Sequence, residues 1–205
     1  MLAKGGEVNI PYEVQAVLNW FERNGYVASV AGGAARNLQF GAKVNDWDIV
    51  VESGGLCHAG AFELSEDLCH EFHKRWPLST VQVTQAYDSA ATDFDERWLA
   101  LSQLEFLENN VSVDVLISTY PTIRETLEHF DSNVNQCYLS RETGNVYYPF
   151  GLPDALLFLK PITVARYVRL VDIAKEIGLP VKGQAVITDL DTLPKREDPT
   201  EDIAW

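Results

Sequence analysis

Some residues and patterns are scarce in this 205-residue chain, and each scarcity excludes a class of protein. The three cysteines are few and odd in number, which argues against the disulfide framework of a small secreted domain. No apolar run reaches 18 residues and the first residues lack an apolar signal core, so we expect a cytoplasmic protein without membrane association. The chain has 16 basic and 30 acidic residues. This excess of acids disfavours a broad surface that binds long nucleic acids, because affinity for nucleic acid depends on neutralising its phosphates.

The remaining composition is that of one ordinary globular unit. With 46% hydrophobic residues the chain can bury a full core, with room for a small appendage. The net charge of −14 is unevenly spread, because residues 189–205 are strongly acidic while residues 160–182 are locally basic. The bases of that segment are Lys160, Arg166, Arg169, Lys175 and Lys182. We expect RNA or a triphosphate to bind there if it binds at all, although Lys175 and Lys182 also suit a solvated helix face.

The most informative segment combines a glycine pair with two closely spaced aspartates. Gly32 and Gly33 follow a short apolar stretch, and their missing Cβ atoms let backbone N–H groups come close to a bulky anion. Asp46 and Asp48 open an apolar run, and strand alternation places both on one face, about 7 Å apart. Two such carboxylates repel each other unless a cation lies between them.

A third aspartate lies in a separate apolar stretch. Asp114 interrupts the alternating segment 111–118, where an unpaired carboxylate would be costly without a cation or a donor. Three aspartates on two neighbouring strands can hold two Mg²⁺ ions for in-line phosphoryl transfer. The alternative interpretation makes Asp46 a turn residue, Asp48 an acid at a sheet edge and Asp114 a salt-bridge partner.

These motifs resemble a known family. The segment with Gly32, Gly33, Arg36, Asp46 and Asp48 resembles the first motif of the head domain of class II CCA-adding enzymes and bacterial poly(A) polymerases, in the DNA polymerase beta-like nucleotidyltransferase superfamily. Segments 129–138, 142–156 and 166–178 are similar to later motifs of the family, in the same order. The resemblance covers roughly residues 12–180.

The resemblance implies a chemistry and a set of roles. Asp46, Asp48 and Asp114 would be catalytic and would bind two Mg²⁺ ions. The nucleotide-binding residues would be Gly32, Gly33, Arg36, Asp131, Asn135, Arg166 and Arg169. The substrate would be an NTP, ATP or CTP, and the acceptor an RNA 3′ end, with tRNA favoured and a partner subunit able to supply RNA-binding domains. The alternatives are transfer to a protein or small molecule, as in antitoxin-like branches, and a regulator that binds nucleotides without turnover.

The chain also departs from the family pattern. His129 and Phe130 stand where the family has two arginines that help to hold the nucleotide, and Asn37 replaces the acid that normally follows Arg36. We find no match for the family's nucleotide-selecting helix, nor for the helical body and tail that grip tRNA. The resemblance therefore gives its weakest support to base selection and to tRNA 3′-end synthesis.

The expected fold is α/β (α+β), with a mixed, mainly antiparallel sheet, helices on one face and carboxylates on the other. We expect a head domain over residues 1–160, a helical neck-like segment over 161–192 and a disordered acidic tail over 193–205. Expected helices span residues 12–24, 61–76, 121–129 and 163–178, and expected strands 26–30, 46–51, 78–84, 97–108, 111–118, 136–141 and 145–148. Residues 85–94 are expected to form a mobile loop.

Two further groups invite functional interpretations. A zinc site is conceivable from Cys57, His58, Cys69, His70 and His73, but a core cysteine with surface histidines suits the spacing better. Four aromatic residues near the second motif could stack on a base, although packing is the commoner role. These four are Tyr138, Tyr147, Tyr148 and Phe150.

Overall fold

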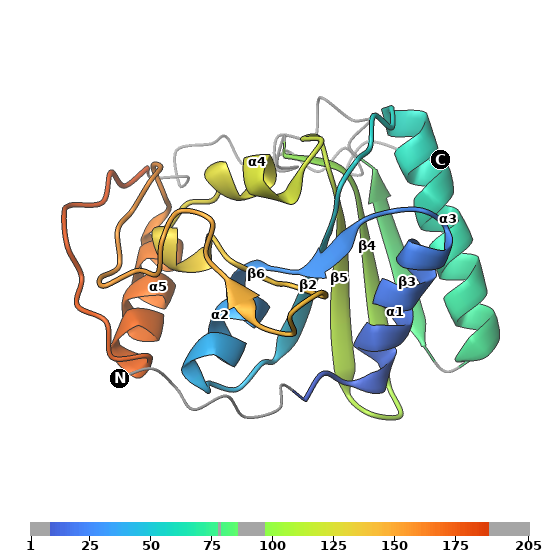
Figure 1. Ribbon diagram of the computed structural model, residues 1–205, viewed down its shortest axis with the longest axis horizontal. Coiled ribbons are helices and arrows are strands. Elements are labelled where there is room, and N and C mark those ends of the chain that lie inside the picture. Colours follow the sequence, from blue (N-terminus) through green and yellow to red (C-terminus); the bar gives the residue numbers. More distant parts are fainter. Residues whose placement is uncertain (1–8, 78, 86–96, 189–205) are drawn as a thin grey trace, which may run out of the picture.

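A computed structural model describes residues 9–77, 79–85 and 97–188 of the chain (Figure 1). The helices of this part are α1 (Tyr12–Arg23), α2 (Gly32–Phe40), α3 (His58–Arg75), α4 (Ile123–Glu128) and α5 (Val164–Glu176), with a 3₁₀ turn η1 (Asn133–Asn135). The strands are β1 (Ala28–Val30), β2 (Asp46–Val51), β3 (Thr80–Gln85), β4 (Trp98–Phe106), β5 (Val111–Ser118), β6 (Tyr138–Leu139) and β7 (Val146–Tyr147).

Five of the strands form one mixed sheet in the order β1-β2-β5-β4-β3. The β2–β5 pair is parallel, and the β1–β2, β5–β4 and β4–β3 pairs are antiparallel. β6 and β7 form a separate small hairpin. The mixed, mainly antiparallel sheet that the sequence predicts is therefore confirmed.

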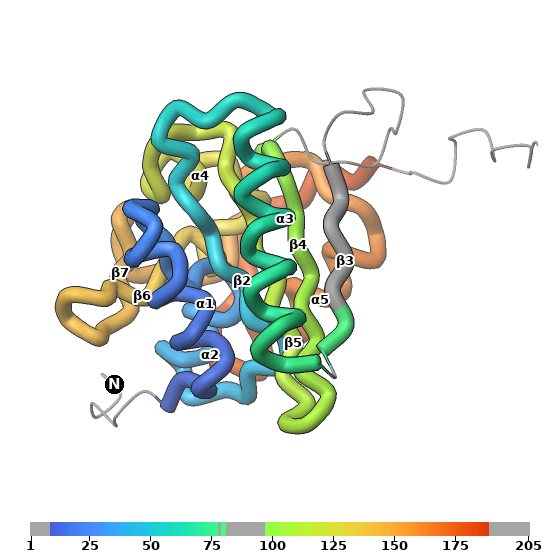
Figure 2. The backbone as a smooth tube through the Cα atoms, turned by 90° about the vertical axis from the view of Figure 1, so that its right-hand side faces the viewer, coloured from blue at the N-terminus to red at the C-terminus, as the bar shows by residue number. Residues whose placement is uncertain are grey.

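The main core lies between the sheet and the helices of one face. α1 contributes Val14, Val17, Leu18 and Phe21 at helical spacing, and α3 contributes Leu64, Leu68 and Phe72. Figure 2 shows α1 and α3 in front of the sheet. The odd-numbered residues of β2, Trp47, Ile49 and Val51, pack into this core, so alternation turns Asp46 and Asp48 to the opposite face.

Two smaller clusters build the other side of the molecule. Ile123 and Leu127 of α4 pack with Val50 and Trp98 on the carboxylate face of the sheet, near one end of the strands. Leu170 and Ala174 of α5 form a third cluster with the buried residues Val134, Leu156 and Ile162. Both clusters lie beside the aspartates. The carboxylate face of the sheet therefore forms the base of a site that the two clusters border.

Local signals explain most element boundaries. Strand β2 covers the predicted residues, and the β4–β5 hairpin turns through Asn110, whose φ of 52° is left-handed, as the Asn-Asn pair predicts. The predicted helix 121–129 begins later, because Thr122 caps it in a capping box with Glu125. α3 begins at His58, three residues before the predicted start, and the β6–β7 hairpin is shorter than predicted.

After residue 160 the described chain contains one helix, α5. Thr163 caps α5 by accepting a hydrogen bond from the backbone of Arg166, and Gly178 follows the helix end with a φ of +73°. The domain limits stay predictions, and the expected tail lies outside the described residues, as does nearly all of the loop expected at 85–94. Among the described helices, none has the length and apolar character needed to cross a membrane.

Candidate active site

The three aspartates lie on one face of two neighbouring strands. Asp48 of β2 is directly opposite Asp114 of β5 in the parallel register, and Asp46 is two residues before Asp48. Adjacent strands are about 4.8 Å apart, so the backbone alone brings the Asp48 and Asp114 carboxylates together. β2 lies between β1 and β5, so Asp48 is not on an edge strand. Gln103 of β4 donates a hydrogen bond of 3.2 Å to Asp114 and is its observed partner.

The electrostatics of the aspartates reflect this crowding. Burial raises the pKa of Asp48 from 3.8 to about 6, with added repulsion from Asp114 and Asp46, while Arg166 and Arg169 act in the opposite direction. Burial also raises the pKa of Asp114, and the Gln103 hydrogen bond opposes that rise. These carboxylates therefore hold negative charge at a cost that a bound cation would relieve.

The donor set suits a hard divalent cation, because carboxylate oxygens are the ligands that Mg²⁺ prefers. In the described residues, however, no three His, Cys, Asp or Glu side chains are gathered closely enough to hold one ion. The strands thus fix the positions of three carboxylates while their side chains do not converge on one point. The residue types and the raised pKa values fit Mg²⁺, and we expect the side chains to take up the ligand geometry when the ion binds.

The glycine pair begins α2 beside the aspartates. Gly32 has a φ of +61°, and a Cβ placed on it would be 3.1 Å from Phe130 Cε2. Its N–H donates to the carbonyl of Cys137 at 3.0 Å, so this amide is not available to a ligand. A Cβ on Gly33 would lie 3.6 Å from both Asp48 Oδ2 and Arg36 Nη2, in ordinary contact. The two glycines therefore differ: Gly32 makes room for Phe130, and Gly33 leaves space between a carboxylate and a guanidinium.

Arg36 is a buried cation held by amide groups. Its Nη1 donates to Asn135 Oδ1, and its Nε and Nη2 donate to Asn37 Oδ1 at 3.0 and 2.8 Å. Burial lowers the pKa of Arg36, although an arginine stays charged. Because both partners are neutral, the guanidinium keeps its full charge at the cavity.

The basic residues of segment 160–182 fall into two groups. Arg166 pairs with Asp131 through two hydrogen bonds, Nε to Oδ2 at 2.5 Å and Nη2 to Oδ1 at 3.2 Å. Burial acts to raise the pKa of Asp131, but the bonds from Arg166 hold it below its ordinary value. Lys175 and Lys182 instead pair at the surface with Asp172 and Asp154, as a solvated face would.

One cavity of about 320 Å³ joins these groups. All ten residues to which the sequence assigns a role line it: Gly32, Gly33, Arg36, Asp46, Asp48, Asp114, Asp131, Asn135, Arg166 and Arg169. They converge there from five elements and from the loop that holds Asp131, and their roles stay predictions. A second groove of about 330 Å³ adjoins the cavity and shares Asn45 and Asp46 with it.

The described fold is similar to solved structures of tRNA-processing enzymes. The Thermotoga maritima CCA-adding enzyme complexed with tRNA matches with a TM-score of 0.58 at 15% identity, over 87% of this chain and 41% of that one. A tRNA nucleotidyltransferase complexed with a primer tRNA and an incoming ATP analog matches with a TM-score of 0.54 at 18% identity, over 81% and 46% of the two chains. This chain has the nucleotidyltransferase fold of the CCA-adding enzymes.

A third match, a CCA-adding enzyme complexed with CTP, has a TM-score of 0.55 and 16% identity over 85% of this chain and 41% of that one. This chain therefore spans less than half the length of these solved structures. No protein-family model matches it, and no curated protein sequence does. The likeness is one of fold, and activity has to be argued from the site.

Arg97 is a cavity residue of this nucleotidyltransferase fold that the sequence did not single out. It immediately precedes β4, and its guanidinium carbon lies 5.2 Å from the centre of the Phe130 ring and 5.4 Å from that of Trp98. Its Nη1 donates to the carbonyl of His129 at 3.2 Å. The available signal was its place at the start of the strand that pairs with β5, but pairing partners are not evident from one sequence.

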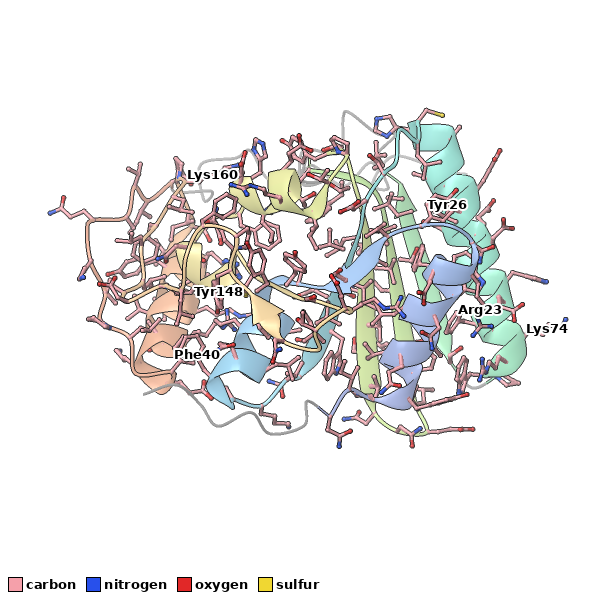
Figure 3. All side chains as sticks on the ribbon, in the orientation of Figure 1. Arg23, Tyr26, Phe40, Lys74, Tyr148 and Lys160 are labelled. Carbon is pink, nitrogen blue, oxygen red and sulfur yellow. The ribbon has the colours of Figure 1, made fainter. Side chains whose placement is uncertain are left out.

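The other candidate groups lie apart from the cavity. Tyr138 and Tyr147 pack edge to face and line a separate small pocket, and Phe150 lies under Arg124. Tyr148, labelled in Figure 3, is near Cys137 and Arg36, and its hydroxyl is buried. These contacts favour packing over base stacking. The cysteines and histidines considered for zinc form no cluster among the described residues.

Proposed function

We propose that this protein is a Mg²⁺-dependent nucleotidyltransferase that transfers a nucleoside monophosphate from an NTP to an RNA 3′ end, with tRNA as the favoured acceptor. One observation carries the proposal: Asp48 and Asp114 lie in register, next to Asp46, in a cavity that four arginines also line. A triphosphate with a divalent cation has the matching distribution of charge, because its phosphates suit the arginines and its metal suits the carboxylates.

The fold supports the same conclusion. Solved proteins that share it are complexed with CTP, with an ATP analog and with tRNA. Those ligands belong to those proteins, and here they show only that the fold accommodates such substrates. The choice between ATP and CTP stays open.

The residues of the site would have separate roles in the transfer. Arg36, Arg166 and Arg169 would hold the triphosphate, and Gly33 leaves space for it to approach. The acceptor oxygen then bonds to the α-phosphorus as the bond to the departing pyrophosphate breaks. The acceptor proton passes to the Asp114 carboxylate where that carboxylate acts as the base, and to solvent where Asp114 holds the metal that lowers the pKa of the hydroxyl.

Mg²⁺ would be held by Asp46, Asp48 and Asp114, and when bound it supplies charge neutralisation and polarises the reacting oxygens. Asn135 and Asp131 would lie on the sugar side of the nucleotide. Because Asp131 is locked to Arg166 and Asn135 to Arg36, each of these polar groups is oriented before the substrate arrives. Such preorganised positioning is the main contribution that a protein makes to phosphoryl transfer.

Transfer to a protein or small molecule is the second candidate, and the net charge of −14 favours it. An acidic protein attracts a cationic acceptor and repels polyanionic RNA. The groove next to Asp46 has mixed charge, with Lys43 and Glu105 among its residues, and would accept either kind of acceptor.

Label transfer from each of the four α-labelled NTPs in the presence of Mg²⁺ tests both candidates. Total tRNA is the acceptor in one reaction and a protein lysate is the acceptor in another. We expect label on tRNA that disappears in the Asp46→Asn, Asp48→Asn double variant. Asp172→Asn is the matched control, because it removes an exposed carboxylate that pairs with Lys175 at the surface.

The outcomes separate the candidates. Label on protein and none on tRNA would replace the RNA acceptor with the second candidate. NTP binding without transfer to any acceptor would leave a nucleotide-binding regulator. Equal labelling by the double variant would remove the aspartates from the mechanism.

A further inference from the structure

Arg97 enters the cavity from a different direction than the other arginines. Arg36 is on α2, and Arg166 and Arg169 are on α5, whereas Arg97 stands at the start of β4, next to the end of the sheet. The cavity is therefore lined by cations from two helices and from the residue that precedes a strand of the sheet.

The position of Arg97 is set by aromatic rings. Its guanidinium carbon is 5.2 Å from the centre of the Phe130 ring and 5.4 Å from that of Trp98, both within cation–π range. Trp98 and Phe130 also pack against each other edge to face, with ring centres 6.4 Å apart. The bond from Nη1 to the His129 carbonyl adds a fixed polar contact. Two ring contacts and one hydrogen bond therefore define the position of the side chain.

Phe130 is itself fitted to the glycine pair. The 3.1 Å between Phe130 Cε2 and a Cβ built on Gly32 means that the ring occupies the space a side chain would take. Gly32, Phe130 and Arg97 therefore form a contiguous stack beside Asp48, whose Oδ2 would lie 3.7 Å from the same Cβ. We call these three residues the Gly32–Phe130–Arg97 stack.

The charges near Arg97 indicate what it binds. Arg97 acts to lower the pKa of Asp131, so its charge is felt at the rim of the cavity. Asp131 already accepts two hydrogen bonds from Arg166, which satisfy its carboxylate without Arg97. Arg97 is a second guanidinium close to this rim. A planar guanidinium with fixed orientation is suited to phosphate oxygens, which it can contact with two parallel hydrogen bonds.

We propose that Arg97 binds the phosphates of the nucleotide and that Phe130 is the platform that orients it. This inference rests on the proposed function, because it assigns a residue to the triphosphate of that same site. It also assigns a function to Phe130, which stands where the family has an arginine. The aromatic ring would position the guanidinium of Arg97, which comes from the start of β4.

Calorimetric titration with ATP and with inorganic tripolyphosphate tests the inference without needing turnover. Arg97→Ala should weaken both ligands about 10-fold, the size of one lost charge-assisted contact. Arg97→Lys keeps the charge but loses the planar fork, so it should weaken binding about 3-fold. Phe130→Leu should act similarly, since it keeps apolar bulk but removes the ring.

The double variant Arg97→Ala, Phe130→Leu distinguishes a platform from an independent contact. If Phe130 acts through Arg97, the double variant should bind no more weakly than Arg97→Ala alone. Arg75→Ala is the matched control, because Arg75 also stacks on aromatic rings, those of Tyr12 and Trp76, but is on α3 away from the cavity. Circular dichroism of each variant establishes that it is folded.

Each outcome has one meaning. Folded Arg97→Ala that binds tripolyphosphate within twofold of the wild type would overturn the inference and leave the proposed function intact. Multiplying effects in the double variant would overturn the platform role of Phe130. A wild-type protein that binds neither ATP nor tripolyphosphate would overturn the proposed function and this inference together.

Discussion

The two walls of the cavity are built in opposite ways. Asp46, Asp48 and Asp114 lie on two adjacent strands, and the backbone register fixes their separation. The arginines come from α2, α5 and the start of β4, and buried or stacked neighbours hold three of them in place. The carboxylate wall is thus a property of the sheet, whereas the arginine wall is a property of tertiary packing.

This difference has energetic consequences. The carboxylates repel one another, and the rigid sheet holds them together against that repulsion. The arginines are held by favourable contacts, with the Asn37 and Asn135 amides, the Asp131 carboxylate and the Phe130 ring. Changes to the carboxylate wall should therefore reduce activity while increasing stability, and changes to the arginine wall should reduce ligand binding without any gain in stability.

The largest expected effect is on the carboxylate wall. Asp114→Asn keeps an oxygen that can accept the hydrogen bond from Gln103 but removes the charge and the basicity. We expect the rate of nucleotidyl transfer to fall about 10²–10³-fold, as when one preorganised electrostatic group is removed from an active site. Steady-state label transfer measures it, with Asp172→Asn as control. A loss below tenfold would show that Asp114 is only a neighbour of the chemistry.

The next effect concerns stability and pH. The folded pKa of Asp48, about 6, exceeds its ordinary value of 3.8, so the stability of the metal-free protein should fall as pH rises through this interval. Asp48→Asn removes this cost, and should be more stable than the wild type by about 1–3 kcal/mol at pH 7 and equally stable near pH 4.

Urea denaturation at the two pH values, with a chelator present, measures this difference. Adding Mg²⁺ should then stabilise the wild type and leave Asp48→Asn unchanged, because ligand binding stabilises only the state that binds. A variant that is less stable than the wild type at pH 7 would contradict the idea that the carboxylates are held together under repulsion.

The same contrast explains what could be predicted from the sequence. Strand alternation gives the direction of Asp46 and Asp48 directly, and a lone acid in an apolar strand marks Asp114. These signals are local, so the bounds of β2 and the face of its aspartates were predicted correctly. The parallel pairing of β2 with β5 is not local, and the sequence predicted only that the two strands are neighbours.

The arginine wall shows where prediction from sequence fails. Arg36 was found only through the resemblance, and Arg166 and Arg169 through the resemblance and the local excess of bases. Arg97 lies in none of the segments that resemble the family. Its neighbours Phe130 and His129 are more than thirty positions away in the sequence, and no periodic pattern links them. Gly32 also differs from expectation, because its N–H bonds to Cys137 rather than facing the ligand.

The two glycines offer a paired test of intermediate size. Gly32→Ala combines a φ of +61° with a 3.1 Å contact to Phe130, so we expect a loss of about 1–3 kcal/mol of stability. Gly33→Ala has only ordinary contacts and a helical position, and should be neutral or stabilising by about 0.5–1 kcal/mol. Its new methyl group would lie between Asp48 and Arg36, so ATP binding should weaken nevertheless.

Thermal denaturation and ATP titration of both variants check this pair. The expected pattern is a fold defect for one glycine and a binding defect with an intact fold for the other. Equal loss of stability in both variants would mean that the glycines share a single structural role. Normal ATP binding by Gly33→Ala would show that the triphosphate does not pass between Asp48 and Arg36.

The smallest effect should come from Asn37→Asp, which restores the acid that the resembled family carries. A carboxylate would strengthen the two bonds from Arg36 but would lose the 2.7 Å donation from Asn37 Nδ2 to the Lys43 carbonyl. These changes oppose each other, so stability should change by less than about 1 kcal/mol. The added negative charge would partly neutralise Arg36, and ATP binding should weaken about 2–5-fold. Calorimetry at two salt concentrations measures both the weakening and its electrostatic origin, since the difference between the variants should shrink at higher salt. Tighter binding by Asn37→Asp would instead mean that Arg36 serves to position Asn135 and does not contact the triphosphate.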